Sequence, residues 1–140
     1  LSAAHLVGSI LWGGGLAAIA LASWLDAARP AEAELAARRV RRLCRGYRLT
    51  CPPGLYLTVL TGVWMLHLDQ PLLRAGFLRI KLAFVALLLI VDAVVAWDLG
   101  RRVRGEPALR RGWLLAAHQV AVLALGMAAI LGVTRPGSPA

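Results

Sequence analysis

Hydrophobic and polar positions divide the chain into four long apolar stretches with short polar segments between them. The apolar stretches cover residues 3–25, 55–73, 77–97 and 113–133. A helix needs about 20 mostly apolar residues to cross the hydrocarbon core of a membrane, and each stretch is close to that length. The pattern therefore predicts an all-α integral membrane fold, a four-helix transmembrane bundle. Because little sequence remains outside the spans, residues 1–140 are expected to form a single transmembrane domain.

Composition supports this interpretation. The chain is 59% hydrophobic and only 16% charged, whereas a soluble domain carries about 25% charged residues. The first apolar stretch is expected to be a retained span and not a signal peptide, because no basic residue precedes it. It is also longer than the apolar part of a signal peptide, which has about 7–15 residues.

The arginines predict the orientation of the bundle. They are concentrated between the first and second spans and between the third and fourth. Short arginine-rich loops stay in the cytoplasm, so both termini are expected on the outer side. The expected location is a bacterial inner membrane, which the chain crosses several times. The net charge of +9 then reflects topology and contact with membrane lipids, with no nucleic-acid partner expected. The two groups of arginines are Arg29, Arg38, Arg39, Arg41, Arg42, Arg45 and Arg48, and Arg101, Arg102, Arg104, Arg110 and Arg111.

The segment before the second span has features of its own. Residues 31–47 place arginines among alanine and leucine at helical spacing, which predicts an amphipathic cytoplasmic helix lying against anionic lipid. Pro52 and Pro53 are then expected to begin the second span, because proline suits the first turn of a helix. Cys44 and Cys51 are seven residues apart, which is not a metal-ligand spacing, and are expected to be structural.

Ionisable residues within or beside the spans are the candidate functional groups. His5, His67, Arg79 and Lys81 are expected to share the outer layer of the bundle. Such residues are costly near hydrocarbon and usually mark a site. The alternatives are that Lys81 extends to the lipid headgroups and that His67 lies at the interface beside Trp64.

Asp92 and His118 form a second candidate group, on the inner side. They lie at matched depths on consecutive antiparallel spans, so a direct contact between them is expected. In such a pair each charge would offset the burial of the other. The alternative is that the two side chains face different neighbours or water.

Histidines in an apolar helical bundle are typical haem ligands, since neutral imidazole is an axial ligand of iron. We expect His5 to ligate haem b, with His67 as the second candidate metal ligand. Lys81 and Arg79 would hold the anionic propionates. The glycines at 13–15 would admit helices or a flat ligand at close range.

The chain resembles a known family from end to end. It is similar to the HemJ-type protoporphyrinogen IX oxidases, a four-span membrane family related to the CopD-like copper-resistance proteins. The resemblance rests on residues at characteristic offsets within the spans and on residue pairs beside them. The matching residues are His5, Trp12, Gly15 and Leu16; Arg42 and Leu43; Pro53, Thr58, Gly62 and Trp64; Phe77, Leu78, Lys81 and Leu82; and Arg135 and Pro136.

The resemblance implies a haem-b-binding protein that oxidises protoporphyrinogen IX and passes electrons into the membrane. It implies that His5 is an axial ligand, and that Lys81 contacts porphyrin carboxylates. Trp12 and Gly15 match the family motif around His5 and are expected to belong to the cofactor site.

This sequence also departs from the family pattern. Asp92 stands where the family has histidine, and His118-Gln119 where it has Asn-Glu. Ala20-Leu21 replaces a Pro-Arg pair. If the chain is an oxidoreductase, Lys81, Asp92 and His118 are the candidate catalytic residues. The departures favour haem or pigment binding over catalysis.

Two other functions are compatible with the sequence. One is a non-catalytic accessory subunit of a larger respiratory or photosynthetic membrane complex, or a homo-oligomer, because glycine-rich spans suit close helix packing. The other is copper handling, although the soft ligands Met65 and Met127 lie far apart from each other and from the cysteines.

Overall fold

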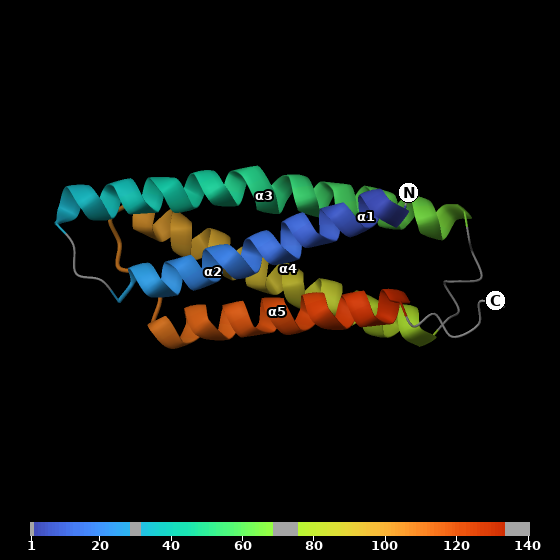
Figure 1. Cartoon of the computed structure of the whole chain (residues 1–140). Coiled ribbons are helices and arrows are strands. Elements are labelled where there is room, and N and C mark those ends of the chain that lie inside the picture. The colour runs from blue at the N-terminus through green and yellow to red at the C-terminus, as the bar shows by residue number, and fades with distance from the viewer. Residues whose placement is uncertain (1, 29–31, 69–75, 134–140) are drawn as a thin grey trace.

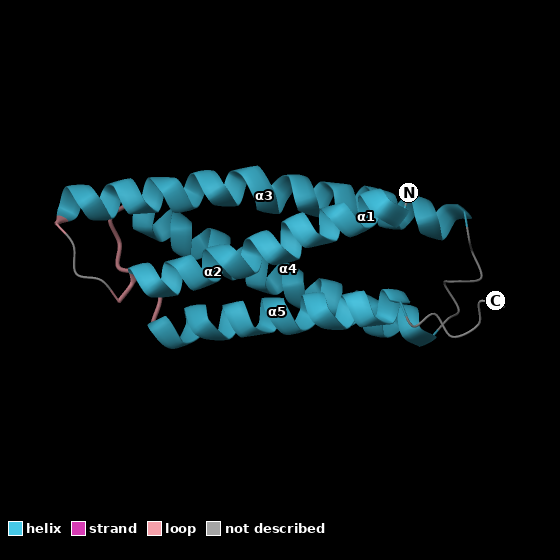
Figure 2. Ribbon diagram, viewed as in Figure 1, coloured by secondary structure: helices cyan, strands magenta, loops and turns pink. Residues whose placement is uncertain are grey.

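The computed structural model describes residues 2–28, 32–68 and 76–133, and within these ranges the fold is entirely helical (Figure 2). The helices are joined by short connections, and no strand occurs in the described ranges. The elements are α1 (Ser2–Ser9), a π-helical segment η1 (Ile10–Gly14), α2 (Gly15–Asp26), α3 (Ala33–Leu68), α4 (Gly76–Val103) and α5 (Arg111–Val133).

The first three elements form one continuous rod. Ser9, Gly14 and Gly15, at the junctions, all have right-handed helical backbone angles. The hydrogen-bond pattern widens to the π type at η1 and then returns to α. Such π segments inside α-helices are uncommon and often lie near functional sites. The rod Ser2–Asp26 confirms a helix at the first apolar stretch.

The rods are stacked side by side (Figure 1). The described chain runs back and forth along the bundle, so α1 begins at the same end at which α3 and α5 finish. α1 and η1 pack against α3, whereas α2 packs chiefly against α5 and α3. The first rod therefore crosses the bundle between α3 and α5, and α4 completes it by packing against α5 and α3.

Glycine allows the first rod and α3 to meet backbone to backbone. A Cβ atom placed on Gly8 would lie 2.8 Å from the backbone nitrogen of Thr58. One on Gly54 would lie 2.9 Å from the carbonyl oxygen of Gly8, and closer still to the backbone nitrogen of Trp12. Small residues at such crossings are a general device of membrane helices. The Gly8–Gly54 crossing fixes the height of α1 against α3.

The core and the outer surface of the bundle are both apolar. Trp12, Leu16 and Leu114 are fully buried, whereas Leu60 and Leu123 are exposed. Among the described residues, three helical stretches are long and apolar enough to cross a membrane: Ser2–Asp26, Ala33–Leu68 and Leu78–Val103. Water would be a poor solvent for this outer surface, which suits hydrocarbon.

The prediction for the second span was wrong in one respect. The expected amphipathic segment and the expected span form one unbroken helix, α3, with Pro52 and Pro53 inside it. The prolines cannot donate hydrogen bonds to the carbonyls four residues earlier, which belong to Arg48 and Leu49. Both of those residues are exposed, so their carbonyls do not have to find a partner in the core.

Tertiary packing explains why the helix does not end at the prolines. α3 is held against the first rod at Cys51, Gly54 and Thr58, which are buried just beside and after the prolines. An interior proline costs about 3 kcal/mol, an amount that burial of a few side chains offsets. The end of the expected span, residues 69–73, lies outside the described residues. α4 in turn continues beyond the expected residue 97 to Val103.

Candidate functional site

At the end of the bundle where α1 begins, His5 is held by two hydrogen bonds to α3. Its Nδ1 atom lies 3.0 Å from the carbonyl oxygen of Thr58 and 3.1 Å from Oγ1 of Thr61. A carbonyl oxygen can only accept, so Nδ1 carries the proton and donates. The Thr61 hydroxyl donates its own hydrogen bond to the carbonyl oxygen of Leu57. Its oxygen can therefore accept a hydrogen bond from Nδ1 of His5.

This tautomer makes Nε2 of His5 the basic atom of the ring. With Nδ1 protonated, the lone pair of neutral imidazole lies on Nε2. The ring packs against α3, since a Cβ on Gly62 would lie 3.2 Å from Cε1 of His5. A histidine ligand whose other nitrogen donates to the protein is the usual arrangement at metal sites.

The structure brings Lys81 to the same end of the bundle. Lys81 is half-buried on α4, close enough to His5 for its charge to act on the imidazole. The expected grouping of these two residues in one layer is therefore present. His67 and Arg79 are exposed at this end of α3 and α4. The His67 ring lies 6.4 Å from the Trp64 ring, centroid to centroid, which agrees with the alternative of an interfacial pair.

Two of the three glycines expected to accept a flat ligand, Gly13 and Gly15, are covered by neighbouring helices, whereas a Cβ on Gly14 would meet nothing within 4 Å. A Cβ on Gly13 would lie 3.0 Å from Leu125 of α5, and one on Gly15 2.6 Å from Oγ1 of Thr50 of α3. Trp12 is buried in the core. A ligand at Trp12 and Gly15 would require the helices to separate. In the part of the chain that the structure describes, no three histidine, cysteine or acidic side chains gather as a metal site.

The expected contact between Asp92 and His118 is wrong. Asp92 accepts a hydrogen bond from the hydroxyl of Tyr47 at 3.0 Å. His118 instead places Nδ1 3.0 Å from the carbonyl oxygen of Ala17, on α2. The two side chains point to different neighbours, because α5 turns His118 towards the first rod while α4 turns Asp92 towards α3.

Asp92 belongs to a polar cluster that sequence reasoning missed. Besides Tyr47, the cluster contains the indole of Trp12, which interacts electrostatically with the Asp92 carboxylate. The indole nitrogen is buried and does not reach hydrogen-bond geometry with any partner in the described residues. Tyr47 could not be selected from the sequence, because it fell in a segment expected to lie on the membrane surface. The cluster joins η1, α3 and α4 inside the apolar core.

A buried ion pair closes the other end of the bundle. Nε of Arg102 lies 2.8 Å from Oδ2 of Asp98, although the two atoms are not aligned for a hydrogen bond. The side chains are only 5% and 1% exposed. The backbone N–H of Leu109 donates to the other carboxylate oxygen at 2.7 Å. The i, i+4 spacing of Asp98 and Arg102 was the one sequence signal for this pair.

The same arginine ties α4 to the first rod. Nη1 of Arg102 lies 3.5 Å from the carboxylate of Asp26, and Arg39 of α3 approaches the same carboxylate at 3.5 Å. Charged side chains from three helices thus meet at the arginine-rich end. Since the charges are largely balanced, this network is best understood as structural.

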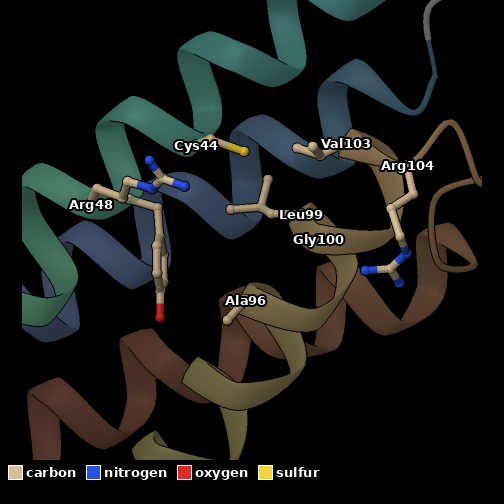
Figure 3. Close-up of a pocket in the computed structure, with 8 residues that line it drawn as sticks. Cys44, Arg48, Ala96, Leu99, Gly100, Val103 and Arg104 are labelled. Carbon is tan, nitrogen blue, oxygen red and sulfur yellow. The ribbon is translucent and has the colours of Figure 1, made fainter.

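Between α3 and α4, near the same end, lies an open cleft of about 360 Å³ (Figure 3). Cys44 and Arg48 line it from α3, and Leu99, Gly100 and Arg104 line it from α4 and its end. Tyr47 also lines it and thereby connects it to Asp92. A second, shallower hollow lies on α5 around His118 and Gln119.

Comparison with known proteins agrees with the resemblance seen in the sequence. The family described as "Predicted integral membrane protein (DUF2269)" matches residues 1–136. The chain is also 25% identical, over 140 aligned residues, to a protein named protoporphyrinogen IX oxidase from Synechocystis sp.. That alignment covers 96% of this chain and 67% of the relative. No solved structure matches.

Proposed function

Because the chain belongs to the predicted integral membrane protein family DUF2269, we propose that it is a haem-b-binding redox protein of the membrane, related in function to protoporphyrinogen IX oxidase. The observation that carries this proposal is the hydrogen-bonded His5, whose free Nε2 lone pair lies at the same end of the bundle as Lys81. The oxidase of Synechocystis sp. aligns across nearly the whole chain.

We place the protein as four antiparallel spans in a bacterial inner membrane, with α5 as the fourth span and both termini outside. The arginine-rich end, which contains the connections from α2 to α3 and from α4 to α5, then faces the cytoplasm. The end with His5 and Lys81 faces outward. This placement puts the candidate haem ligand on the side opposite the Asp98–Arg102 pair.

The residues at the outer end fit the donor chemistry of a haem site. His5 offers one imidazole nitrogen, and the hydrogen bonds of Nδ1 to Thr58 and Thr61 would orient the ring and increase its basicity. Lys81 offers a cation for a propionate, with the exposed Arg79 as a further one. His67 remains the second candidate ligand. Haem would supply one-electron redox chemistry at this position.

The protein groups available for proton handling lie at two separate places. The Asp92 carboxylate accepts a hydrogen bond from the Tyr47 hydroxyl inside the core. His118 is fixed by the carbonyl of Ala17, so its Nε2 is again the basic nitrogen. We propose that Asp92, through Tyr47, holds a proton beside the α3–α4 cleft. His118 would act independently of it, and Lys81 would bind carboxylates of the porphyrin at the outer end.

A visible spectrum of the purified protein tests the haem proposal. We expect a reduced b-type band that His5→Ala removes. His118→Ala is the matched control, since His118 is also a half-buried histidine bonded to a carbonyl. Thr61→Val should keep the band but shift the midpoint potential, because one hydrogen bond to the ligand is lost. An unchanged spectrum in His5→Ala would refute the assignment of the ligand.

Oxidase activity needs its own measurement. Protoporphyrin fluoresces whereas protoporphyrinogen does not, so its appearance in membranes containing the protein can be followed directly. If the substrate is oxidised here, Lys81→Gln should raise the concentration needed for half-maximal rate. Haem binding without any increase in fluorescence over control membranes would leave electron transfer as the function and reject the oxidase.

A further inference from the structure

We propose that the cleft between α3 and α4 is a binding site for one anionic phospholipid, with the headgroup phosphate at the arginines and an acyl chain along the apolar floor. The site is independent of the haem proposal and lies at the opposite end of the bundle. Its evidence is the shape of the cleft, its charge and its opening towards the exposed apolar surface.

The floor of the cleft is apolar. Leu99 is buried there, and Ala96 and Gly100 continue the floor along α4. Val103, at the mouth, is 63% exposed, and Leu49, the neighbour of Arg48 on α3, is 65% exposed. A volume of about 360 Å³ is within the range of small-molecule sites. The cleft therefore suits a hydrocarbon chain better than it suits water.

The rim of the cleft is positively charged. Arg48 is exposed and forms no ion pair with any residue that the structure describes. Arg104 folds back over α4, so that Nη1 would lie 3.7 Å from a Cβ on Gly100. Its Nε donates to Glu106 at 2.8 Å, but Arg101 donates to the same carboxylate at 2.9 Å. One carboxylate is thus shared by two guanidinium groups, which leaves net positive charge.

These features together identify the ligand class. An occupant must carry an anionic group for Arg48 or Arg104, which lie on opposite sides of the cleft (Figure 3), and an apolar part for the floor between them. Basic pockets between membrane helices at the arginine-rich side are where anionic lipid headgroups bind. Phosphate also accepts the paired hydrogen bonds that guanidinium donates. Neutral phosphatidylcholine lacks the net charge, and inorganic phosphate lacks the chain.

The thiol of Cys44 can report whether a lipid occupies the cleft. The Cys44 side chain points from α3 towards Leu99 and Val103 across the cleft (Figure 3). The other thiol, Cys51, is fully buried. The rate at which N-ethylmaleimide, a small neutral reagent, modifies Cys44 can be followed by peptide mass, with Cys51 measured in the same sample. A lipid in the cleft covers Cys44 and slows the modification.

The experiment titrates dioleoyl phosphatidylglycerol into the full chain in dodecyl maltoside micelles. We expect this lipid to protect Cys44, while dioleoyl phosphatidylcholine and inorganic phosphate do not. The double variant Arg48→Gln/Arg104→Gln should bind the anionic lipid about tenfold more weakly or worse, since charge-assisted hydrogen bonds are lost. The control, Arg38→Gln/Arg110→Gln, removes the same charge from exposed positions outside the cleft and should bind normally.

Three outcomes would overturn the proposal. Equal protection by the two lipids would show that the cleft does not select charge. Equal protection by inorganic phosphate would show a site for a soluble anion. Undiminished protection in the Arg48 and Arg104 double variant would show that the arginines do not bind the headgroup. If the double variant does not fold, as judged by circular dichroism, the two single variants replace it and each is expected to show partial loss.

Discussion

Replacing Gly54 with alanine tests whether the first rod and α3 are held by direct backbone contact. A Cβ at this position would lie 2.9 Å from the carbonyl oxygen of Gly8 and 2.9 Å from the carbonyl carbon of Leu11. Ordinary van der Waals contact begins at 3.4 Å and the backbone nitrogen of Trp12 would lie closer still, so the helices must move apart by more than about 0.5 Å. The obstructing atoms are backbone, which cannot rotate away.

The expected size of the effect follows from two opposing contributions. Alanine is the better helix former by about 1 kcal/mol, which favours the variant. Inserting a methyl into a closed contact usually costs about 1–3 kcal/mol, and the separation also loosens the contacts of Trp12 and Thr58 with each other's helices. We therefore expect a net loss of stability of up to about 2 kcal/mol in Gly54→Ala.

Gly14→Ala is the matched control. Gly14 also lies inside a helix, in η1 of the first rod, but a Cβ there meets nothing within 4 Å. This variant should be as stable as the unmodified chain or slightly more stable. Stability is measured by unfolding in mixed micelles of mild detergent and SDS, followed by circular dichroism. The reasoning fails if Gly54→Ala unfolds at the same or a higher SDS fraction than Gly14→Ala.

Three further outcomes are expected. In a double-mutant cycle, Asp92→Asn and His118→Gln should have additive effects on stability, because the two side chains have separate partners; a coupling above about 0.5 kcal/mol would contradict the structure. Arg102→Gln should cost about 3–5 kcal/mol in the same unfolding assay, because Asp98 is left buried and unpaired. Hydrogen bonds from arginines hold the pKa of Glu106 below its ordinary value, so its small contribution to stability is present above the ordinary pKa and lost as the pH falls through the lowered one; a carboxyl titration by NMR measures this, and an ordinary or raised pKa would contradict it.

The Arg102 prediction has two controls. Arg110→Gln removes an exposed charge from the same end of the bundle and should change stability by less than about 0.5 kcal/mol. Asp98→Asn combined with Arg102→Gln should recover much of the loss, since neither charge is then left alone in the core. A double variant that is less stable than Arg102→Gln would mean that the arginine, and not the unpaired carboxylate, determines the cost.

The sequence predicted the helices well where apolar length alone decides the outcome. The stretches 3–25 and 113–133 coincide with helical rods nearly to the residue. The start of the second span was wrong because the rule for Pro52 and Pro53 is local, whereas the packing of α3 on the first rod is not. Position along a helix also predicts depth, and depth was enough to place His5 and Lys81 in one layer.

Depth does not give the direction in which a side chain points around its helix. That direction depends on how whole helices are rotated in the bundle, which one sequence does not reveal. The predicted Asp92–His118 contact failed for this reason, although both residues were expected at the same depth. Tyr47 was missed because residues 31–47 were expected to form a helix on the membrane surface, where Tyr47 would not face the core. Asp98 lies one residue beyond the expected end of the third span and was not among the candidates, although it is buried.

The continuity of α3 makes the bundle sensitive to membrane thickness. Its 36 residues extend for about 54 Å at about 1.5 Å per residue, well beyond a hydrocarbon core of about 30 Å. A thicker or thinner bilayer is accommodated by tilting such a helix. Since α3 is one unbroken helix that includes both the part packed on the first rod and the part that carries Arg41, Arg45 and Arg48, a tilt of the whole helix raises or lowers these guanidinium groups against the phosphate layer. A change in bilayer thickness thereby changes the depth of the positive charges on the arginine-rich half of α3 relative to the phosphate layer.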